Sequence, residues 1–314
     1  MTSMKVIYRK IPSRKIECVA SIGVFDGVHL GHRFILEKLR EKSRQLKLPS
    51  LVVTFDVPPQ VLLQKINLKI QKQFPGFLTD SKCKAKFLKQ EGIDYVWFLK
   101  VSNSLLGLSG KEFLDYLFSH FKVKYIIVGE DFRFGHNGKS NIRYLEKISK
   151  QYGFGVKVLK KITKEKNTIS SSLIRRLIKK SYFSKIENFL GREFSIEGKV
   201  VKGMGYGRKL GYPTANVDYD GYVIPKEGVY AACVELDKKQ YLSAVNIGVR
   251  PTIFSSQEKI LEAHIFNFKK NILGKKIRIR FIKKLRDEKK FSSEKELKQA
   301  IANDISYIKI HYKL

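Results

Sequence analysis

Residues 18–32, CVASIGVFDGVHLGH, pass from an apolar run through a glycine-containing loop into a helical pattern. The run Cys18–Phe25 is typical of a buried strand, and Arg33–Leu46 repeats apolar residues at helical spacing. The glycines between them allow close backbone approach to a ligand, and a helix start presents unpaired N–H groups to an anion. This stretch therefore predicts a strand–loop–helix unit that binds a phosphate.

Two histidines in this loop, His29 and His32, lie on either side of Gly31. Their spacing lets both imidazoles face one phosphate, where they would stabilise charge that builds on an α-phosphate during nucleotidyl transfer. A pair of surface or metal-binding histidines is the alternative, but the strand–loop–helix context favours a nucleotide. The candidate nucleotide-binding residues of the loop are Gly23, Phe25, Asp26 and Gly31.

The alternation of strands and helices continues through the first half of the chain. Further strands are expected at Leu51–Phe55, Tyr95–Leu99, Tyr125–Val128 and Val156–Leu159. Further helices are expected at Lys82–Gln90, from a Ser109/Glu112 capping box through Phe118, and at Ile142–Tyr152. This order indicates an α/β fold, a doubly wound, Rossmann-like parallel sheet with helices on both faces.

The pattern changes near residues 183–192, where short strand-like runs replace the alternation. They are Phe194–Val201, Gly228–Leu236, Leu242–Ile247, Ile260–Phe266 and Lys276–Ile282. Clustered strands without intervening helices indicate an antiparallel β-barrel. A terminal helix is expected after a second capping box, Ser293 with Glu296. We place the boundary near residue 185, which gives domains 1–185 and 186–314.

The composition contains 62 Lys and Arg against 29 Asp and Glu, a formal net charge of +33. The excess divides as +23 over residues 1–185 and +10 over residues 186–314, without a basic tail. The spread of the excess over both parts favours a solvated lysine-rich surface whose field attracts anionic small molecules such as ATP. A basic nucleic-acid-binding protein remains the alternative from another class, although we expect no nucleic-acid partner.

The sequence lacks any apolar run near the ~18 residues that span a bilayer, so no membrane partner is expected. The first residues carry no apolar stretch typical of a secretory signal. The three cysteines are far apart and odd in number, which argues against a disulfide framework. These features predict a cytoplasmic protein.

A second glycine-containing segment, GMGYGRKLGYPTAN, covers residues 203–216. Arg208 and Lys209 would contact phosphates, while Thr214 and Asn216 offer oxygen ligands suited to Mg²⁺ beside a nucleotide. Glycines alone are weak evidence, because ordinary turns use them too.

The segment GVFDGVHLGH resembles the HxGH motif of the nucleotidylyltransferases in the form that bacterial FAD synthetases carry. VVTFDVPP (52–59), VGEDFRFG (128–135) and ISSSLIRR (169–176) follow in that family's order. The resemblance implies that His29 and His32 are catalytic. It also implies ATP contacts from Ser171 and Arg175, and flavin contacts from Asp131, Phe132 and Phe134. Val57 and Pro58 replace the Pro-His usual in the family, which puts part of the FMN or adenine contact in doubt.

The segment GRKLGYPTAN resembles the signature of riboflavin kinases, and four later segments follow in order: GVYAACV, VNIGVRPT, LEAHIFNF and LRDEKKFSSEKELKQAIANDI. The resemblance implies that Thr214 and Asn216 bind Mg²⁺ and ATP, and that Glu262 is the catalytic base. Gly203, Gly205, Gly207 and Arg208 would bind ATP. Arg286, Glu288 and Phe291 would border the flavin. The family's usual Asp-Phe is Asn267-Phe268 here.

Together these resemblances cover about residues 15–310 and imply a bifunctional riboflavin kinase and FAD synthetase. Its substrates and products would be riboflavin, FMN, FAD and ATP, with Mg²⁺ as cofactor, in a monomer or weak homo-oligomer. A riboflavin kinase whose first domain has lost adenylylation is the alternative that residues 57 and 58 raise.

Overall fold

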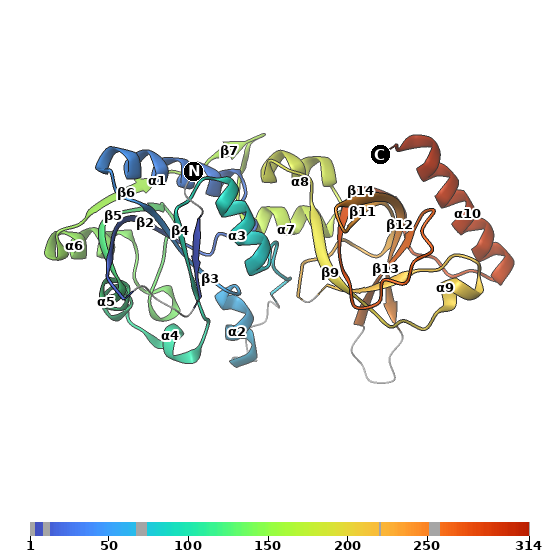
Figure 1. Ribbon diagram of the computed structural model, residues 1–314, viewed down its shortest axis with the longest axis horizontal. Helices are drawn as coiled ribbons and strands as arrows, with labels where there is room; N and C mark the ends of the chain where they lie inside the picture. The colour runs from blue at the N-terminus through green and yellow to red at the C-terminus, as the bar shows by residue number, and fades with distance from the viewer. Residues whose placement is uncertain (1–3, 9–12, 67–73, 220, 251–257, 314) are drawn as a thin grey trace. The chain divides into compact units, whose positions relative to one another are not determined.

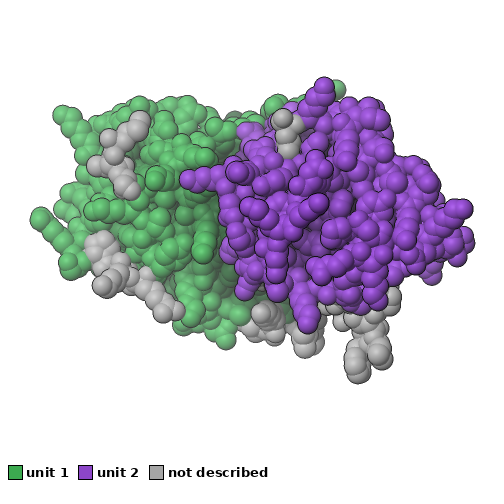
Figure 2. Space-filling model, turned by 45° about the vertical axis from the view of Figure 1, so that its right-hand side comes forward, with its two compact units in different colours: residues 1–173 green, residues 174–314 purple. Residues whose placement is uncertain are grey.

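The computed structural model describes residues 4–8, 13–66, 74–219, 221–250 and 258–313. Its chain divides into two compact units, Met1–Leu173 and Ile174–Leu314 (Figure 2). The division falls inside one helix, α7 (Ser171–Lys179), whereas the boundary expected from the sequence lies near residue 185. Pro251 and Thr252 of the VNIGVRPT segment lie outside the described residues.

The first unit is built on a six-stranded parallel sheet with the order β1-β4-β3-β2-β5-β6 (Figure 1). Its strands are β1 (Lys5–Ile7), β2 (Ile16–Ile22), β3 (Ser50–Phe55), β4 (Tyr95–Leu99), β5 (Phe121–Gly129) and β6 (Gly155–Leu159). From β2 the chain runs outward through β3 and β4 on one side and then through β5 and β6 on the other, which confirms the doubly wound fold. Strand β1 was not expected from the sequence.

Helices cover both faces of this sheet, each over its own apolar cluster. On one face, α1 (Leu30–Leu46) and α3 (Ser81–Gln90) contribute Leu36, Leu39 and Leu88. The opposite face is covered by α4 (Asn103–Gly107), α5 (Gly110–His120) and α6 (Ile142–Tyr152). The smaller elements of this unit are α2 (Pro59–Ile66), a 3₁₀ turn (His136–Gly138), β7 (Thr163–Lys164) and β8 (Asn167–Thr168).

The second unit is a closed six-stranded antiparallel barrel with the order β10-β13-β12-β11-β14-β9, as expected. The strands are β9 (Ser195–Val201), β10 (Ala215–Asp218), β11 (Gly228–Leu236), β12 (Lys239–Arg250), β13 (Glu258–Ile265) and β14 (Lys276–Arg286). Ile277, Ile279 and Phe281 point into the barrel core, as their alternation predicts. Its helices are α8 (Phe183–Leu190), α9 (Tyr206–Lys209) and the terminal α10 (Glu294–His311).

Two predicted boundaries around the first glycine-containing loop are wrong. The strand expected to reach Phe25 ends at Ile22, and Phe25 itself has a φ of 48°, which extended backbone does not allow. The helix expected from Arg33 begins at Leu30, because His29 caps it: its Nδ1 accepts the N–H of His32 at 3.3 Å.

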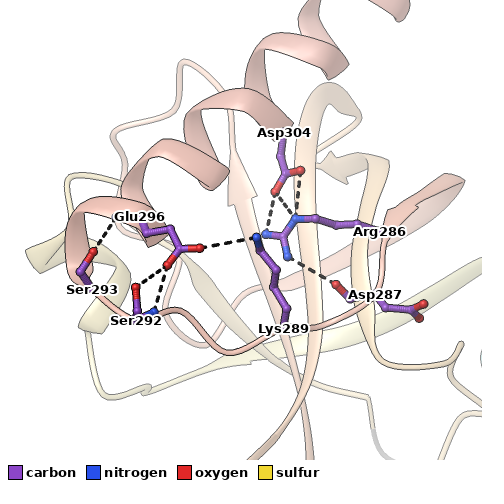
Figure 3. A network of polar contacts seen from close by, with 7 residues as sticks. All are labelled: Arg286, Asp287, Lys289, Ser292, Ser293, Glu296 and Asp304. Atoms are coloured by element: carbon purple, nitrogen blue, oxygen red, sulfur yellow. Dashed lines mark hydrogen bonds and ion pairs between the residues drawn. The ribbon is translucent and has the colours of Figure 1, made fainter.

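The capping box at Ser109 and Glu112 is confirmed, whereas the one expected at α10 forms only in half. The Ser293 hydroxyl accepts the N–H of Glu296 at 3.2 Å. The Glu296 carboxylate instead accepts the N–H and the hydroxyl of Ser292, at 3.0 and 2.8 Å (Figure 3). Ser292 offers two donors to one oxygen, which the backbone of Ser293 alone cannot match.

Within the described part of the chain, no helix combines the length and the apolar character needed to cross a membrane. Cys18, Cys83 and Cys233 are all unbridged.

Candidate functional site

The loop between β2 and α1 lies at the carboxyl end of the central strand β2, where the strand order reverses. Ligands of open α/β sheets bind at such a point. Phe25 and Val28 both have positive φ, 48° and 37°, so the loop is held in a conformation that non-glycine residues seldom adopt. The surrounding chain must therefore fix it.

Asp26 provides much of that fixation and is 2% exposed. Its carboxylate accepts the backbone N–H groups of Leu78 at 2.9 Å and Thr79 at 3.0 Å. The N–H of Gly27 donates to the Thr79 hydroxyl at 3.0 Å. Gly27 has a φ of 85°, and a Cβ there would lie 2.6 Å from Leu78. These contacts of the Asp26 side chain thus anchor the loop to residues 78–79.

The two histidines predicted to act together are brought together. Their rings stack with centroids 3.6 Å apart and an interplanar angle of 16°, and the ring of Phe25 lies against His32 at 5.1 Å. His29 is buried and His32 is half-buried. A Cβ at Gly31 would lie 3.2 Å from the His29 ring, so this position favours glycine. Two imidazoles thus share the start of α1, where a helix attracts anions.

The start of α7 contacts the same loop through the serines predicted to be caps. Ser170 is the cap, since its hydroxyl accepts the N–H of Leu173 at 3.2 Å. The Ser171 hydroxyl donates to the carbonyl of Asp26 at 2.9 Å. Arg175 lies one turn further along the helix.

The aromatic residues of the VGEDFRFG segment divide between surface and core. Phe134 is 6% exposed and packs against Phe113. Phe132 is only partly buried and stacks on Phe134 with centroids 5.3 Å apart. Asp131 is exposed and pairs with Lys161 at 3.0 Å. Phe132 therefore offers the accessible ring of this segment, with Phe134 supporting it.

The TFDVPP segment is ordered without the histidine that the family usually has. The Asp56 carboxylate accepts the N–H groups of Val57 at 2.8 Å and Val101 at 3.1 Å. Pro59 then begins α2. The turn is thus fixed by Asp56.

Lys84 of α3 was missed by the sequence analysis. It is 0% exposed, and its ammonium donates to the carbonyl of Phe55 at 2.9 Å. Burial lowers the pKa of Lys84 to about 8, although the negative charges of Asp26, Asp56 and Asp80 act in the opposite direction. Nothing in the run SKCKAKF distinguishes this lysine from its exposed neighbours.

Replacing Lys84 by Met should change how the stability of the first unit depends on pH. Between pH about 8 and the ordinary lysine value of about 10.4, the folded wild type binds fewer protons than the unfolded chain. Its unfolding free energy should therefore rise relative to the variant, by at most about 1.4 kcal/mol per pH unit. Urea unfolding at several pH values, followed by the fluorescence of Trp97, the single tryptophan, measures this difference in unfolding free energy. If the unfolding free energies of the wild type and the variant changed in parallel with pH, the prediction would be contradicted.

In the second unit, strand register aligns the predicted base with two asparagines. Asn216 of β10 pairs with Glu262 of β13, and Glu262 pairs with Asn246 of β12. Directly paired residues project from the same face of a sheet. All three are half-buried, while their neighbours Val217, Ala263 and Val245 fill the barrel core. A polar row therefore crosses three strands on the outer face of the barrel.

Asn246 was not among the predicted site residues. It lies in the quoted VNIGVRPT segment, but its alignment with Glu262 depends on pairing between strands that the sequence alone does not register.

The glycine segment lies beside this row. A Cβ at Gly203 would overlap the amide of Asn216, so only glycine allows this approach. The carbonyl of Pro213 contacts His264 Nδ1 at 2.8 Å, which ties the PTAN segment to the strand of Glu262. Arg208 and Lys209 lie on the short helix α9 with exposed side chains. The segment therefore combines close backbone approach with accessible cations.

Arg286 makes contacts within its own unit at the end of β14. Its guanidinium donates to the Asp304 carboxylate from Nε at 3.0 Å and from Nη2 at 2.9 Å (Figure 3). It also lies over the ring of Phe291, 5.6 Å from the centroid. Arg286 thus joins α10 to the loop that carries Glu288 and Phe291.

Glu288 lies in this loop close to strand β12, since a Cβ at Gly248 would lie 2.5 Å from its Oε1. Partial removal from water and the charge of Glu227 raise the pKa of Glu288, while Arg286 acts to lower it.

Replacing Asp304 by Ala should lower the unfolding free energy of the second unit by about 1–3 kcal/mol, because it removes a charged, largely buried partner of Arg286. Asp287→Ala is the matched control: that carboxylate is 68% exposed, and its loss should cost less than about 1 kcal/mol. Urea unfolding followed by circular dichroism compares them. Equal losses would mean that the Arg286–Asp304 pair contributes no more than a surface contact.

Comparison with known proteins gives matches over both units. A family model for FAD synthetase matches residues 11–173, and one for riboflavin kinase matches residues 190–311. A relative from Buchnera aphidicola subsp. Schizaphis graminum, named bifunctional riboflavin kinase/FMN adenylyltransferase, is 37% identical over 94% of each chain. An Escherichia coli protein of the same name is 36% identical over 91% of this chain and 90% of its own.

A solved structure described as a macrolide-efflux protein from Streptococcus pneumoniae has the same overall fold. It is 27% identical, has a TM-score of 0.81, and the match covers 98% of this chain and 99% of that one.

Proposed function

The chain belongs to the family of bifunctional riboflavin kinases/FMN adenylyltransferases, and on this premise we propose that each unit carries one of the two reactions. The second unit transfers the γ-phosphate of ATP to riboflavin, which gives FMN and ADP. The first unit transfers AMP from a second ATP to FMN, which gives FAD and pyrophosphate. The observation that carries the proposal is that each unit contains its own glycine-containing loop beside a set of polar side chains.

At the first centre, the phosphates of ATP bind at the start of α1. A phosphate oxygen of FMN attacks the α-phosphorus, and pyrophosphate leaves. His29 and His32 donate to the phosphoryl oxygens as negative charge builds on them. Their stacked rings support this role, because they place two imidazoles side by side at a helix start, where anions bind. The backbone N–H groups at the start of α7 contribute further donors to the polyphosphate.

At the second centre, the 5′-hydroxyl of riboflavin attacks the γ-phosphorus and ADP leaves. Glu262 accepts the hydroxyl proton as the new O–P bond forms. Asn216 and Asn246, which are paired with Glu262 on either side, support this role by presenting amides beside the carboxylate. Arg208 and Lys209 contact the ATP phosphates from the glycine segment. Glu288 and Phe291 border the flavin ring, and Arg286 holds their loop.

Magnesium fits the second centre by the chemistry of its donors. Thr214 and Asn216 offer oxygen atoms, the ligands that Mg²⁺ prefers, and the backbone of Gly203 packs closely against the Asn216 amide. When bound, the ion neutralises part of the phosphate charge.

The proposal is tested by incubating the chain with riboflavin, ATP and Mg²⁺ and separating the flavins over time. FMN should appear first and FAD afterwards. Accumulation of FMN without FAD, even when FMN is supplied, would reduce the chain to a riboflavin kinase, the alternative raised by Val57 and Pro58. Unchanged riboflavin would overturn the proposal for the second unit.

A further inference from the structure

The buried ammonium of Lys84 lies close to two segments of the first centre, which are the end of β3 and the loop between β2 and α1. It donates to the carbonyl of Phe55, the last residue of β3, at 2.9 Å, and lies 3.5 Å from the hydroxyl of Thr54. That hydroxyl donates in turn to the carbonyl of Val24, in the loop between β2 and α1, at 2.9 Å. One lysine thus reaches both the histidine-bearing loop and the strand that leads into the TFDVPP turn.

The residues that precede α3 contact the same loop at a second point. Leu78 and Thr79 hold the carboxylate of Asp26, and Asp80 caps α3 by accepting the N–H of Cys83 at 2.7 Å. The loop is therefore fixed at two points, at Val24 by the hydroxyl of Thr54 and at Asp26 by the residues that precede α3. Its positive φ values at Phe25 and Val28 require such fixation, because strained backbone persists only where its surroundings determine it.

Packing alone does not explain a lysine at this position. Burial of an ammonium is costly, and a side chain that only fills the space between α3 and the sheet would be apolar. Lysine instead supplies donors to carbonyl and hydroxyl oxygens at the carboxyl end of β3. Its charge is also matched by Asp26, Asp56 and Asp80, the carboxylates that face it.

We propose that Lys84 is a positioning residue for adenylyl transfer, and that through Thr54 it holds the 23–29 loop in the conformation that presents His29 and His32. The inference rests on the proposed function of the first unit. Lys84 itself does not contact substrate. Its effect should appear in kcat more than in KM, because misplaced histidines weaken the transition state more than the bound ground state.

The test compares Lys84→Met with Lys86→Met, which removes an exposed lysine from the same helix. Lys84→Met should lower kcat for FAD formation from FMN by about 10–100-fold, with a smaller change in KM, because small displacements of catalytic groups have effects of this size. Lys86→Met should leave kcat for FAD formation within about twofold of the wild-type value. Riboflavin phosphorylation should be unchanged in both. Normal adenylylation by Lys84→Met would overturn the proposal.

A second variant, Thr54→Val, keeps the side-chain shape and removes the hydroxyl between Lys84 and Val24. It should also lower kcat, and the double variant should be no slower than Lys84→Met, because both act through one connection. If the losses of kcat in the two single variants multiply in the double variant, Lys84 and Thr54 act separately, and the route through Thr54 is overturned. Thr54→Val also provides the test if the first unit of Lys84→Met does not fold, as Trp97 fluorescence reports.

Amide hydrogen exchange separates this inference from the proposed function. Peptides covering residues 23–29 should exchange faster in Lys84→Met than in Lys86→Met, whether or not the chain makes FAD. Unchanged exchange there would overturn the positioning role. Absence of FAD from the wild type, with faster exchange in the variant, would refute the function and the catalytic consequence while leaving the loop contact supported.

Discussion

Glu262→Gln should lower FMN formation from riboflavin by about 10²–10⁴-fold, because the amide keeps the shape of the carboxylate but cannot accept the hydroxyl proton. Formation of FAD from supplied FMN should persist, since that chemistry belongs to the other unit. The two half-reactions are measured separately by flavin chromatography, each with its own flavin substrate. The prediction depends on the position of Glu262 between Asn216 and Asn246 on the outer face of the barrel.

Glu187→Gln is the control for this variant. It makes the same chemical change at an exposed position of α8 in the same unit, and it should not alter either rate. FMN formation within a few-fold of the wild type in Glu262→Gln would exclude Glu262 as the base. Loss of FAD formation from FMN in that variant would contradict the assignment of the reactions to separate units.

Replacing either His29 or His32 should impair FAD formation and leave FMN formation intact, which is the opposite of the effect expected for Glu262→Gln. His32→Ala should lower FAD formation from FMN by about 10²–10³-fold, because a donor to the developing phosphoryl charge is lost. Riboflavin phosphorylation should continue, so the variant should accumulate FMN. The measurement is the same pair of half-reactions.

His29 needs a more careful substitution because its Nδ1 also caps α1. His29→Asn keeps a side-chain acceptor that is favoured at a cap while it removes the imidazole, so its effect reports the chemistry more than the cap. His120→Gln, which removes the half-buried histidine at the end of α5, is the control and should leave adenylylation unchanged. Adenylylation at the wild-type rate in His29→Asn and His32→Ala would mean that the first loop does not act on ATP.

Local patterns in the sequence predict much of the fold. The strand–loop–helix of residues 18–46 and the alternation at Ile277, Ile279 and Phe281 follow from periodicity and turn residues, and the structure confirms both. The end of β2 does not follow, because Phe25 is apolar like the strand before it. The left-handed backbone at Phe25, next to an Asp26 anchored to residues 78–79, keeps Phe25 out of the strand.

The parts of the sites that depend on contacts between distant segments could not be predicted from the residues alone. Asn246 aligns with Glu262 through register between β12 and β13. Lys84 is one of four lysines in α3, and the fold alone determines which of them is buried against the carboxyl end of β3. Arg286 matched a flavin-binding segment, yet its contact with Asp304 arises from the return of α10 to the barrel.

Isotope transfer tests most directly that the chain contains two different phosphate-transfer centres. The chain is incubated with riboflavin, Mg²⁺ and ATP labelled either in the γ-phosphate or in the α-phosphate, and FMN and FAD are separated. Label from the γ-position should enter FMN and FAD, whereas label from the α-position should enter FAD alone. Entry of γ-label into FMN with no α-label in any flavin would contradict the account of the first unit, and absence of both labels from the flavins would contradict the account of both.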